Sequence, residues 1–351
     1  MGKKYDFITI GGATLDVFVE TPEAGIITVE VQEGKAPYMV YPYGSKLDIE
    51  KFAFEIGGGG LNTALNFKNL GFKTATIVKI GKDPMAKAIM DTVKAHEIEE
   101  KHIIVSKKEH SGLSVILISF QGDRTVLAHR GTNATLKTDE IDFDAIKESK
   151  WLYLAPLNGE STNALNDIAM FAEKHDVNLS INVGTSSIKN CKNNLPAVLK
   201  TAEIVIMNLE EAQMMTEMLV RPNSSKENFD DCFIHPDIIS IIKKVKDMSG
   251  GVVVITDGKH GAYAFDGKKY YKCGEFPAKV VSTLGAGDAF ASTFTAVYGK
   301  SGDIKKALMY ASVNAASVVE VFSAQKGFLT FDEIEKRLKN NTQYSAEEFY
   351  A

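Results

Sequence analysis

Residues 280–300 read VVSTLGAGDAFASTFTAVYGK and place two glycines and an aspartate where a helix-forming run begins. The first amides of a helix have no partner inside the helix, and the helix dipole is positive at that end, so such a start can bind phosphate. Gly285 and Gly287 lack a Cβ and let the backbone approach an anion. Asp288 could then be a general base that deprotonates a hydroxyl attacking phosphorus. It could also be an N-cap or a first-turn acid.

A second glycine-rich segment, EIGGGGLNTALN, precedes a predicted helix. The four glycines 57–60 could form a tight turn or a backbone cradle for a polyhydroxyl ligand, to which Asn62 would add an amide that donates and accepts. The segment does not fit the dinucleotide-binding pattern, because the sixth residue is Asn62 counted from Gly57 and Thr63 counted from Gly58. A P-loop is also disfavoured, because the GKS string at 299–301 has Phe294 where the first glycine belongs.

The elements that position these loops alternate between predicted strands and helices. From residue 61 onward, apolar strand-like runs such as WLYLAPL and GVVVITDG are interleaved with amphipathic segments, which predicts a mainly parallel sheet with helices on both faces. Two segments, at about 16–55 and 111–131, have no interleaved helix, and the second contains a hairpin around a Gln-Gly-Asp turn. We expect these two segments to form a small β-sheet lid. The polar, proline-bounded residues 221–236 are expected to be a surface insertion.

Composition excludes several classes of protein. The chain has 351 residues, of which 44% are hydrophobic and 24% charged, as in an ordinary globular protein. A formal net charge of -5 gives no general attraction to nucleic acid. The three cysteines lie far apart and make no CxxC pair, and the N-terminus lacks a signal-peptide core. We expect a cytoplasmic protein with a small-molecule substrate and with no nucleic-acid or membrane partner.

Five motifs between residues 11 and 290 occur in an order that resembles the ribokinase or PfkB carbohydrate kinase family: GGATLD, GGGGLN, NLEE, TDGKHG and STLGAGDAF. The resemblance implies one three-layer α/β/α domain over residues 1–351, with a β lid. It also implies ATP-dependent phosphorylation of a hydroxymethyl group on a small polyhydroxylated substrate, a sugar or sugar acid. ATP and Mg²⁺ are the implied cofactors. A nucleoside kinase and a non-catalytic regulator that binds a sugar or nucleotide remain alternatives.

The resemblance also implies roles for individual residues. The position of Asp288 resembles the catalytic base, with an anion hole made by the amides of Gly285, Ala286 and Gly287. The positions that resemble substrate contacts are Asp16, Gly58, Gly59 and Asn62. The positions that resemble the nucleotide and magnesium site are Asn208, Glu211 (through water), Thr256, Gly258, Gly261 and, beside the adenine, Asn314. The alternatives are a helix cap for Asn208 and Glu211, a strand turn for 256–261, and a structural amide for Asn314.

Some positions depart from the family pattern. Ser282 stands where many members have an aspartate that helps to hold a monovalent cation, and FSAQKGFLT replaces the usual Gly-Ala then Ser pattern, so activation by potassium stays open. Ribose is not a safe prediction, because Leu157 and Asn158 stand near the expected substrate-binding glutamate and Glu160 lies further on.

The lid carries its own expectations. Three tyrosines, Tyr38, Tyr41 and Tyr43, could stack on a nucleobase, but we favour a role in covering the apolar face of the lid. The hairpin has apolar residues on both faces, Val115 and Leu117 on one and Ile116 and Ile118 on the other. One of these faces needs a partner, so we predict a homodimer through the lid.

Overall fold

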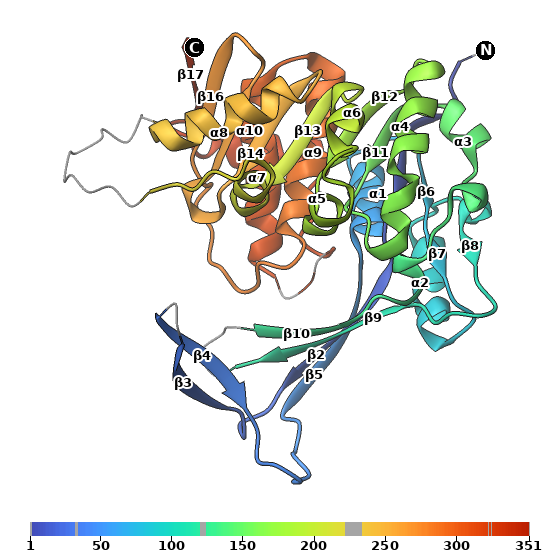
Figure 1. Cartoon of the computed structure of the whole chain (residues 1–351), viewed down its shortest axis with the longest axis vertical. Coiled ribbons are helices and arrows are strands. Elements are labelled where there is room, and N and C mark those ends of the chain that lie inside the picture. The colour runs from blue at the N-terminus through green and yellow to red at the C-terminus, as the bar shows by residue number, and fades with distance from the viewer. Residues whose placement is uncertain are drawn as a thin grey trace.

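The computed structural model describes residues 2–31, 34–119, 124–221, 234–321, 323 and 325–350. Its centre is a nine-stranded sheet in the order β17-β16-β15-β14-β13-β12-β11-β1-β6 (Figure 1). The strands from β6 to β14 are parallel, and those from β14 to β17 are antiparallel. The bounds are β1 (Tyr5–Ile10), β6 (Thr74–Ile77), β11 (Ser149–Leu154), β12 (Asn178–Asn182), β13 (Ile204–Asn208), β14 (Val252–Thr256), β15 (Ala262–Phe265), β16 (Lys269–Cys273) and β17 (Ala346–Tyr350). The predicted mainly parallel sheet is confirmed, and the short turn after β14 makes its neighbour antiparallel.

Helices cover both faces of this sheet, which gives three layers (Figure 1). Strand β14 shows why its sequence is apolar throughout: Val253 and Ile255 belong to one core cluster, and Val252 and Val254 to the other. The first cluster lies under α3 (Phe143–Lys147), α4 (Leu165–Lys174), α5 (Thr185–Cys191), α6 (Leu195–Lys200), α7 (Leu209–Thr216) and α8 (Pro236–Asp247). The second lies under α1 (Gly59–Asn69), α9 (Ala286–Ser301), α10 (Ile304–Val319) and α11 (Phe331–Lys339).

A separate four-stranded sheet, which we call the lid, lies below the main body in Figure 1. Its order is β10-β9-β2-β5, with bounds β2 (Thr14–Glu20), β5 (Lys51–Gly57), β9 (Gly112–Ile118) and β10 (Arg124–His129). A ribbon of β3 (Gly25–Val31) and β4 (Gly34–Val40) extends from it. Helix α2 (Pro84–Ala95) packs at its base, next to the short pair β7 (Lys79–Ile80) and β8 (Ile104–Val105). The predicted fold of a large sheet with a small β lid is confirmed.

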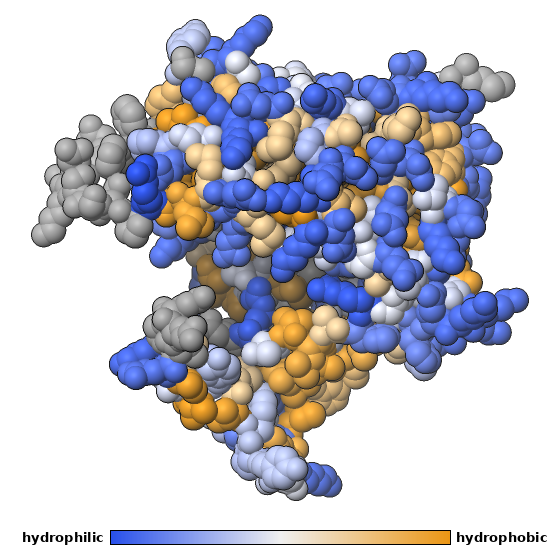
Figure 2. All heavy atoms as spheres, in the orientation of Figure 1, coloured by the Kyte–Doolittle hydropathy of each residue, from blue (hydrophilic) through white to orange (hydrophobic). Residues whose placement is uncertain are grey.

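The two faces of the lid differ in burial. Asp16, Phe18 and Ile116 lie on the face turned toward the main body and are buried. Across the other face, the register places Leu127, Val115, Val17 and Phe54 in one row, and Leu127 and Phe54 are 56% and 60% exposed. Figure 2 shows apolar side chains gathered over the lid and a hollow between the lid and the body. The alternation of the strands therefore builds one face for the cleft and one apolar face exposed to solvent.

Two sequence expectations fall partly outside the described residues. The Gln-Gly-Asp turn at 121–123 is one, although the β9–β10 hairpin on either side of it is described. Most of the predicted surface insertion is the other, since 222–233 are not described and α8 begins at Pro236. Within the described ranges, no helix is long and apolar enough to cross a membrane.

Candidate active site

The start of α1 is held against the end of β1. The amides of Gly60 and Leu61 donate to the carbonyl oxygen of Gly12 at 3.0 and 3.3 Å. Gly58 has φ +94°, and a Cβ there would lie 2.5 Å from that same oxygen, so only glycine allows this close approach. The glycine run therefore fixes the first turn of α1 and directs the Asn62 side chain toward α9.

Asp288 lies in the first turn of α9 but does not cap it. Gly285 is the N-cap, in the left-handed conformation with φ +80°, and no side chain accepts a hydrogen bond from the first amides. The interpretation of Asp288 as an N-cap is therefore wrong. Its carboxylate Oδ2 instead accepts a hydrogen bond from Nδ2 of Asn62 at 2.9 Å. Burial raises the pKa of Asp288, and the Asn62 hydrogen bond opposes this rise.

Asp16 lies near Asp288, although the two residues come from the lid and the body. Its side chain is buried on β2, and a Cβ at Gly57 would overlap its Oδ2, so the first glycine of the run makes room for it. Burial raises the pKa of Asp16 to about 6; a hydrogen bond with Ser114 lowers it, and the charge of Asp288 raises it. Two buried acids with raised pKa values thus interact near the start of α9, as in many catalytic sites.

A cavity of about 440 Å³ is lined in part by the start of α9. Six of the predicted residues line it: Asn208, Thr256, Gly258, Gly261, Ala286 and Gly287. Its remaining wall is mostly apolar and includes Phe276, Ala278, Val280, Ala315, Ala316 and Val319. Sequence reasoning missed this wall, because its apolar residues before the STLGAGDAF motif and on α10 belong to no motif. The volume lies in the range of small-molecule sites.

Asn208 and Glu211 form a reciprocal capping box at the start of α7. The Asn208 side chain accepts from the amide of Glu211 at 2.8 Å, and Glu211 Oε2 accepts from the amide of Asn208 at 3.0 Å. Glu211 Oε1 accepts from the amide of Thr185 at 3.1 Å. Burial raises the pKa of Glu211. The helix-cap interpretation therefore describes these contacts, and a role in phosphate or magnesium binding stays a prediction.

Asn314 does not line the cavity. Its side chain is fully buried between α10, α1 and α9, where Nδ2 donates to Asn66 Oδ1 at 3.0 Å and to Thr293 Oγ1 at 2.7 Å. Its Oδ1 accepts from the amide of Leu329 at 2.9 Å. Its neighbour Ala315 lines the cavity instead. The interpretation as a structural amide therefore describes these contacts, and a place beside the adenine stays a prediction.

Asn314→Leu is expected to lower the free energy of unfolding by about 2 to 5 kcal/mol. The substitution removes the hydrogen-bond partner of the Leu329 amide N–H and that of Asn66 Oδ1. Urea denaturation measures this loss. Ser312→Ala is the matched control, since Ser312 lies on the same helix and lines the cavity. We expect ATP affinity, measured well below the melting temperature, to be unchanged in Asn314→Leu. An unchanged stability with lost ATP affinity would favour the adenine assignment.

Most of the residues that differ from the family pattern make structural contacts. Leu157 is buried in the core, Asn158 Oδ1 accepts from Ser186 Oγ at 3.1 Å, and Glu160 is exposed. Ser282 Oγ accepts from the amide of Leu284 at 3.3 Å.

The lid tyrosines lie on or just after β4. Tyr43 is fully exposed, Tyr38 is about half exposed, and the hydroxyl of Tyr41 donates to Met39 Sδ at 2.9 Å. Neither Tyr38 nor Tyr43 is buried against the face that carries Asp16. Both of their proposed roles, stacking on a base and covering the lid, stay predictions.

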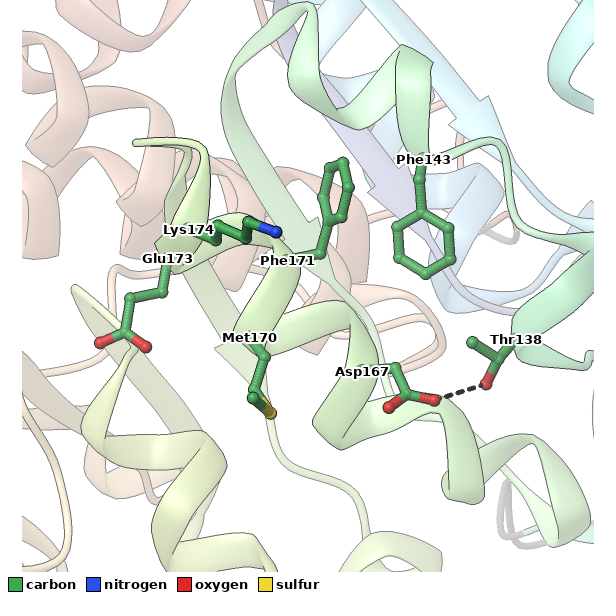
Figure 3. A pocket seen from close by; sticks show the side chains of 7 residues that line it. All are labelled: Thr138, Phe143, Asp167, Met170, Phe171, Glu173 and Lys174. Atoms are coloured by element: carbon green, nitrogen blue, oxygen red, sulfur yellow. Dashed lines mark hydrogen bonds between the residues drawn. The ribbon is translucent and has the colours of Figure 1, made fainter.

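A second hollow lies far from these loops, on the outer surface of α3 and α4 (Figure 3). Phe143, Phe171 and Met170 line it, and Asp167 accepts a hydrogen bond from Thr138 at its edge at 3.1 Å. It contains none of the predicted site residues. It is an open surface groove rather than the place where the glycine loops and acids meet.

Comparison with known proteins decides the family. A family model described as pfkB family carbohydrate kinase matches residues 30–330, which is most of the chain. The chain belongs to the pfkB family. The prediction of an ATP-dependent sugar kinase is thereby confirmed at the level of the family.

This pfkB family chain resembles several curated proteins. It is 29% identical over 322 residues to a 5-dehydro-2-deoxygluconokinase of Clostridium botulinum, covering 87% of this chain and 89% of that protein. It is 28% identical over 310 residues to a protein of the same name from Geobacillus thermodenitrificans, covering 82% and 86%.

Solved structures of the pfkB family share its fold. The structure of Arabidopsis thaliana ribokinase complexed with ribose and ATP matches with a TM-score of 0.76 at 20% identity, over 97% of this chain and 99% of that one. A Methanocaldococcus jannaschii nucleoside kinase matches with a TM-score of 0.73 at 18% identity, over 97% and 100%. At these identities the likeness shows the ribokinase-like fold and leaves the substrate open.

Proposed function

We propose that the protein transfers the γ-phosphoryl group of ATP to a hydroxymethyl group of a small polyhydroxylated sugar or sugar acid, with Mg²⁺ as cofactor. One observation carries this proposal. Ala286 and Gly287 at the glycine-capped start of α9 line a cavity of about 440 Å³, and the next residue, Asp288, interacts through its charge with the buried Asp16 of the lid. We infer that a donor in the cavity and an acceptor bound by Asp16 can both reach this one base.

ATP fits the cavity chemically. The apolar wall around Phe276 and Val319 suits a base, and the free amides of Ala286 and Gly287 suit phosphate. No three His, Cys, Asp or Glu side chains in the described ranges form a metal cluster. We therefore propose that Mg²⁺, which neutralises phosphate charge when bound, is held mainly by the nucleotide and by water on Glu211.

In the proposed reaction, Asp16 binds hydroxyl groups of the acceptor, and Gly58, Gly59 and Asn62 line the same side. Asp288 accepts the proton of the attacking hydroxyl at its carboxylate. The amides of Gly285, Ala286 and Gly287 stabilise the negative charge on the transferring phosphoryl group. Relatives named 5-dehydro-2-deoxygluconokinase support a sugar acid as acceptor. Arg124 places a positive charge beside the cavity that we assign to ATP, because its guanidinium donates to Oγ1 of Thr283 in the cavity wall at 2.8 Å.

The test is turnover with a panel of acceptors. The purified protein with Mg-ATP should form ADP in the presence of 5-dehydro-2-deoxygluconate, 2-keto-3-deoxygluconate, fructose or ribose. Adenosine and cytidine test the nucleoside kinase alternative, which the ribokinase-like fold permits. A thermal-shift competition with the same compounds identifies the ligand independently, because a true ligand stabilises the folded form. Absence of turnover with every acceptor, together with no ATP-dependent thermal shift, would refute the proposal.

We also propose a homodimer in which the exposed apolar faces of two lids pack together, and a cytoplasmic location. The dimer is supported by the two adjacent rows of apolar side chains on that face, which include Phe52 at 67% exposed and Phe54 at 60%. Faces of this kind usually mark an interface.

Phe54→Glu is expected to convert a dimer into a monomer, because it would bury a charge in the middle of the interface. Sedimentation velocity at micromolar concentration measures this change. Tyr43→Glu is the control: it adds the same charge at a fully exposed aromatic residue beyond the strands of this face, and it should leave the dimer intact. A monomeric wild-type protein would contradict the dimer.

A further inference from the structure

The segment FSAQKGFLT, between α10 and α11, departs from the family pattern and has no role in the reaction described above. Residues 323, 325 and 326 of this segment are described, and together they contact both the lid and the acid site. Ser323 is buried, and its Oγ accepts from the amides of Gln325 at 3.3 Å and Lys326 at 3.2 Å. The serine hydroxyl thus holds Gln325 and Lys326 next to Ser323, and these three described residues are what we call the 323–326 turn.

The lid holds one side of this turn. Glu55 on β5 accepts a hydrogen bond at Oε2 from Ser323 Oγ (2.8 Å). Its Oε1 forms an ion pair with Lys326 Nζ (2.6 Å). Glu55 pairs with Asp16 in the β2–β5 register, so it lies on the cleft face of the lid. Its side chain is 11% exposed, whereas that of Lys326 is 73% exposed. A largely desolvated carboxylate with two donors is a stronger anchor than an ordinary surface pair.

The other side of the turn contacts Asp288 through Asn62. Gln325 Nε2 donates to Asn62 Oδ1 at 3.0 Å, and Asn62 Nδ2 donates to Asp288 Oδ2 at 2.9 Å. An ionised carboxylate can only accept, so the Asn62 amide must turn its nitrogen toward Asp288 and its oxygen away. The Gln325 amide supplies the donor that this oxygen needs. Rotation of the Asn62 amide would place two acceptors against each other at Asp288.

We propose that the 323–326 turn is a positioning device that couples the lid to the base: Glu55 orders the turn, and Gln325 then orients Asn62 so that it donates to Asp288. The inference rests on the proposed role of Asp288 as base. Gln325, Glu55, Ser323 and Lys326 touch neither substrate in this scheme and act through Asn62. A lid that releases Glu55 also releases the donor that keeps Asp288 aligned.

The coupling predicts the direction of a pKa change. The ionised form of Asp288 is favoured by the Asn62 donor and disfavoured by burial. The titratable groups whose charges interact with it are Asp16 on β2 and Tyr153 on β11. Loss of the oriented donor leaves the effect of burial unopposed, so the pKa of Asp288 rises. Because the base acts when deprotonated, the acid limb of the pH profile of kcat then moves to higher pH.

The test replaces Gln325 with Leu, which keeps the bulk of the side chain without a donor. The pKa of Asp288 is followed by NMR of protein carrying ¹³C-labelled aspartate, with the signal assigned by Asp288→Asn. We expect a rise of about one unit in Gln325→Leu and a smaller rise in Glu55→Gln. In kinetics, kcat at pH 7 should fall about tenfold in Gln325→Leu, with KM for ATP unchanged.

Glu20→Gln is the matched control. Glu20 lies on the same face of the lid and pairs with Lys51 at 3.3 Å, within the lid and away from the turn. Glu20→Gln should change neither the pKa of Asp288 nor kcat. The double variant Glu55→Gln with Gln325→Leu should match Gln325→Leu alone, because both substitutions act through one path.

Two results would overturn the inference: an unchanged pKa of Asp288 in Gln325→Leu, or additive effects in the double variant. A wild-type protein without turnover would refute the proposed function alone. The NMR titration needs no turnover and would still decide whether the turn orients the base.

Discussion

Asp288→Asn should reduce kcat by about 10² to 10⁴-fold, because the asparagine keeps the shape of the side chain but cannot accept a proton from the acceptor hydroxyl. The loop geometry should persist, since Gly285 is the N-cap of α9 and Asp288 makes no capping contact. Burial raises the pKa of Asp288, so its charge destabilises the fold at neutral pH. The melting temperature at pH 7 should therefore stay the same or rise. Steady-state kinetics and thermal unfolding on the same preparation check both parts.

Asp288→Ala distinguishes the base from a helix-capping residue. If Asp288 were a helix cap, its replacement by alanine would lower the free energy of unfolding by about 1 kcal/mol. The structure predicts no such loss, because Gly285 is the N-cap of α9. We expect Ala to be as inactive as Asn and to bind ATP normally. A fully active Asn variant would refute the catalytic assignment. ATP consumption that is the same in the wild type and in both variants would favour a non-catalytic regulator.

Asp16→Asn is expected to lower kcat/KM for the acceptor by about 10- to 100-fold, because hydrogen bonds to a charged group are replaced by weaker neutral ones. The affinity for ATP should be unchanged, since Asp16 lies on the lid and does not line the nucleotide cavity. Isothermal titration with ATP and kinetics with the acceptor separate the two effects. Equal loss of ATP affinity would indicate that the lid as a whole is disturbed.

The same substitution should increase stability at neutral pH. Burial raises the pKa of Asp16 from the ordinary value of 3.8 to about 6. Between these values the folded state binds more protons than the unfolded state, so stability falls as pH rises from about 4 to 6. Asparagine removes this loss of stability, so the free energy of unfolding at pH 7 should rise, by at most about 3 kcal/mol. Urea denaturation at pH 4 and pH 7 should show the gain at pH 7 alone, and a loss at pH 7 would contradict it.

The sequence predicted the parts of the site that depend on the backbone. Glycines before an apolar helical run indicated the starts of α1 and α9, and the alternation of elements indicated the parallel sheet that brings them together. Asp288 was found by its place beside these glycines, whereas Asp16 was indicated by the resemblance to the family. The pairing of Asp16 with Asp288 across the lid and the body follows from the tertiary fold, so no local spacing could indicate it.

The remaining parts of the site have no local signal. Phe276 and Val319 are ordinary apolar residues until the fold places them around a cavity. Asn314 matched a motif position, but the direction of its side chain on α10 places it in a buried network with Asn66 and Thr293. The sequence assigns no role to Glu55 or Gln325, and only their contacts connect them to the base.

The division of the two acids between the lid and the body affects how ATP is conserved. In the proposed reaction, an acceptor with several hydroxyl groups touches Asp16 on the lid and Asp288 on the body at once, and its binding energy brings the two parts together. A single water molecule has no second hydroxyl group with which to hold the lid. A lid that no acceptor holds can release Glu55, and with it the contacts that orient Asp288 in this structure. In the proposed reaction this arrangement would discriminate against hydrolysis and so limit the unproductive loss of ATP without a separate proofreading step.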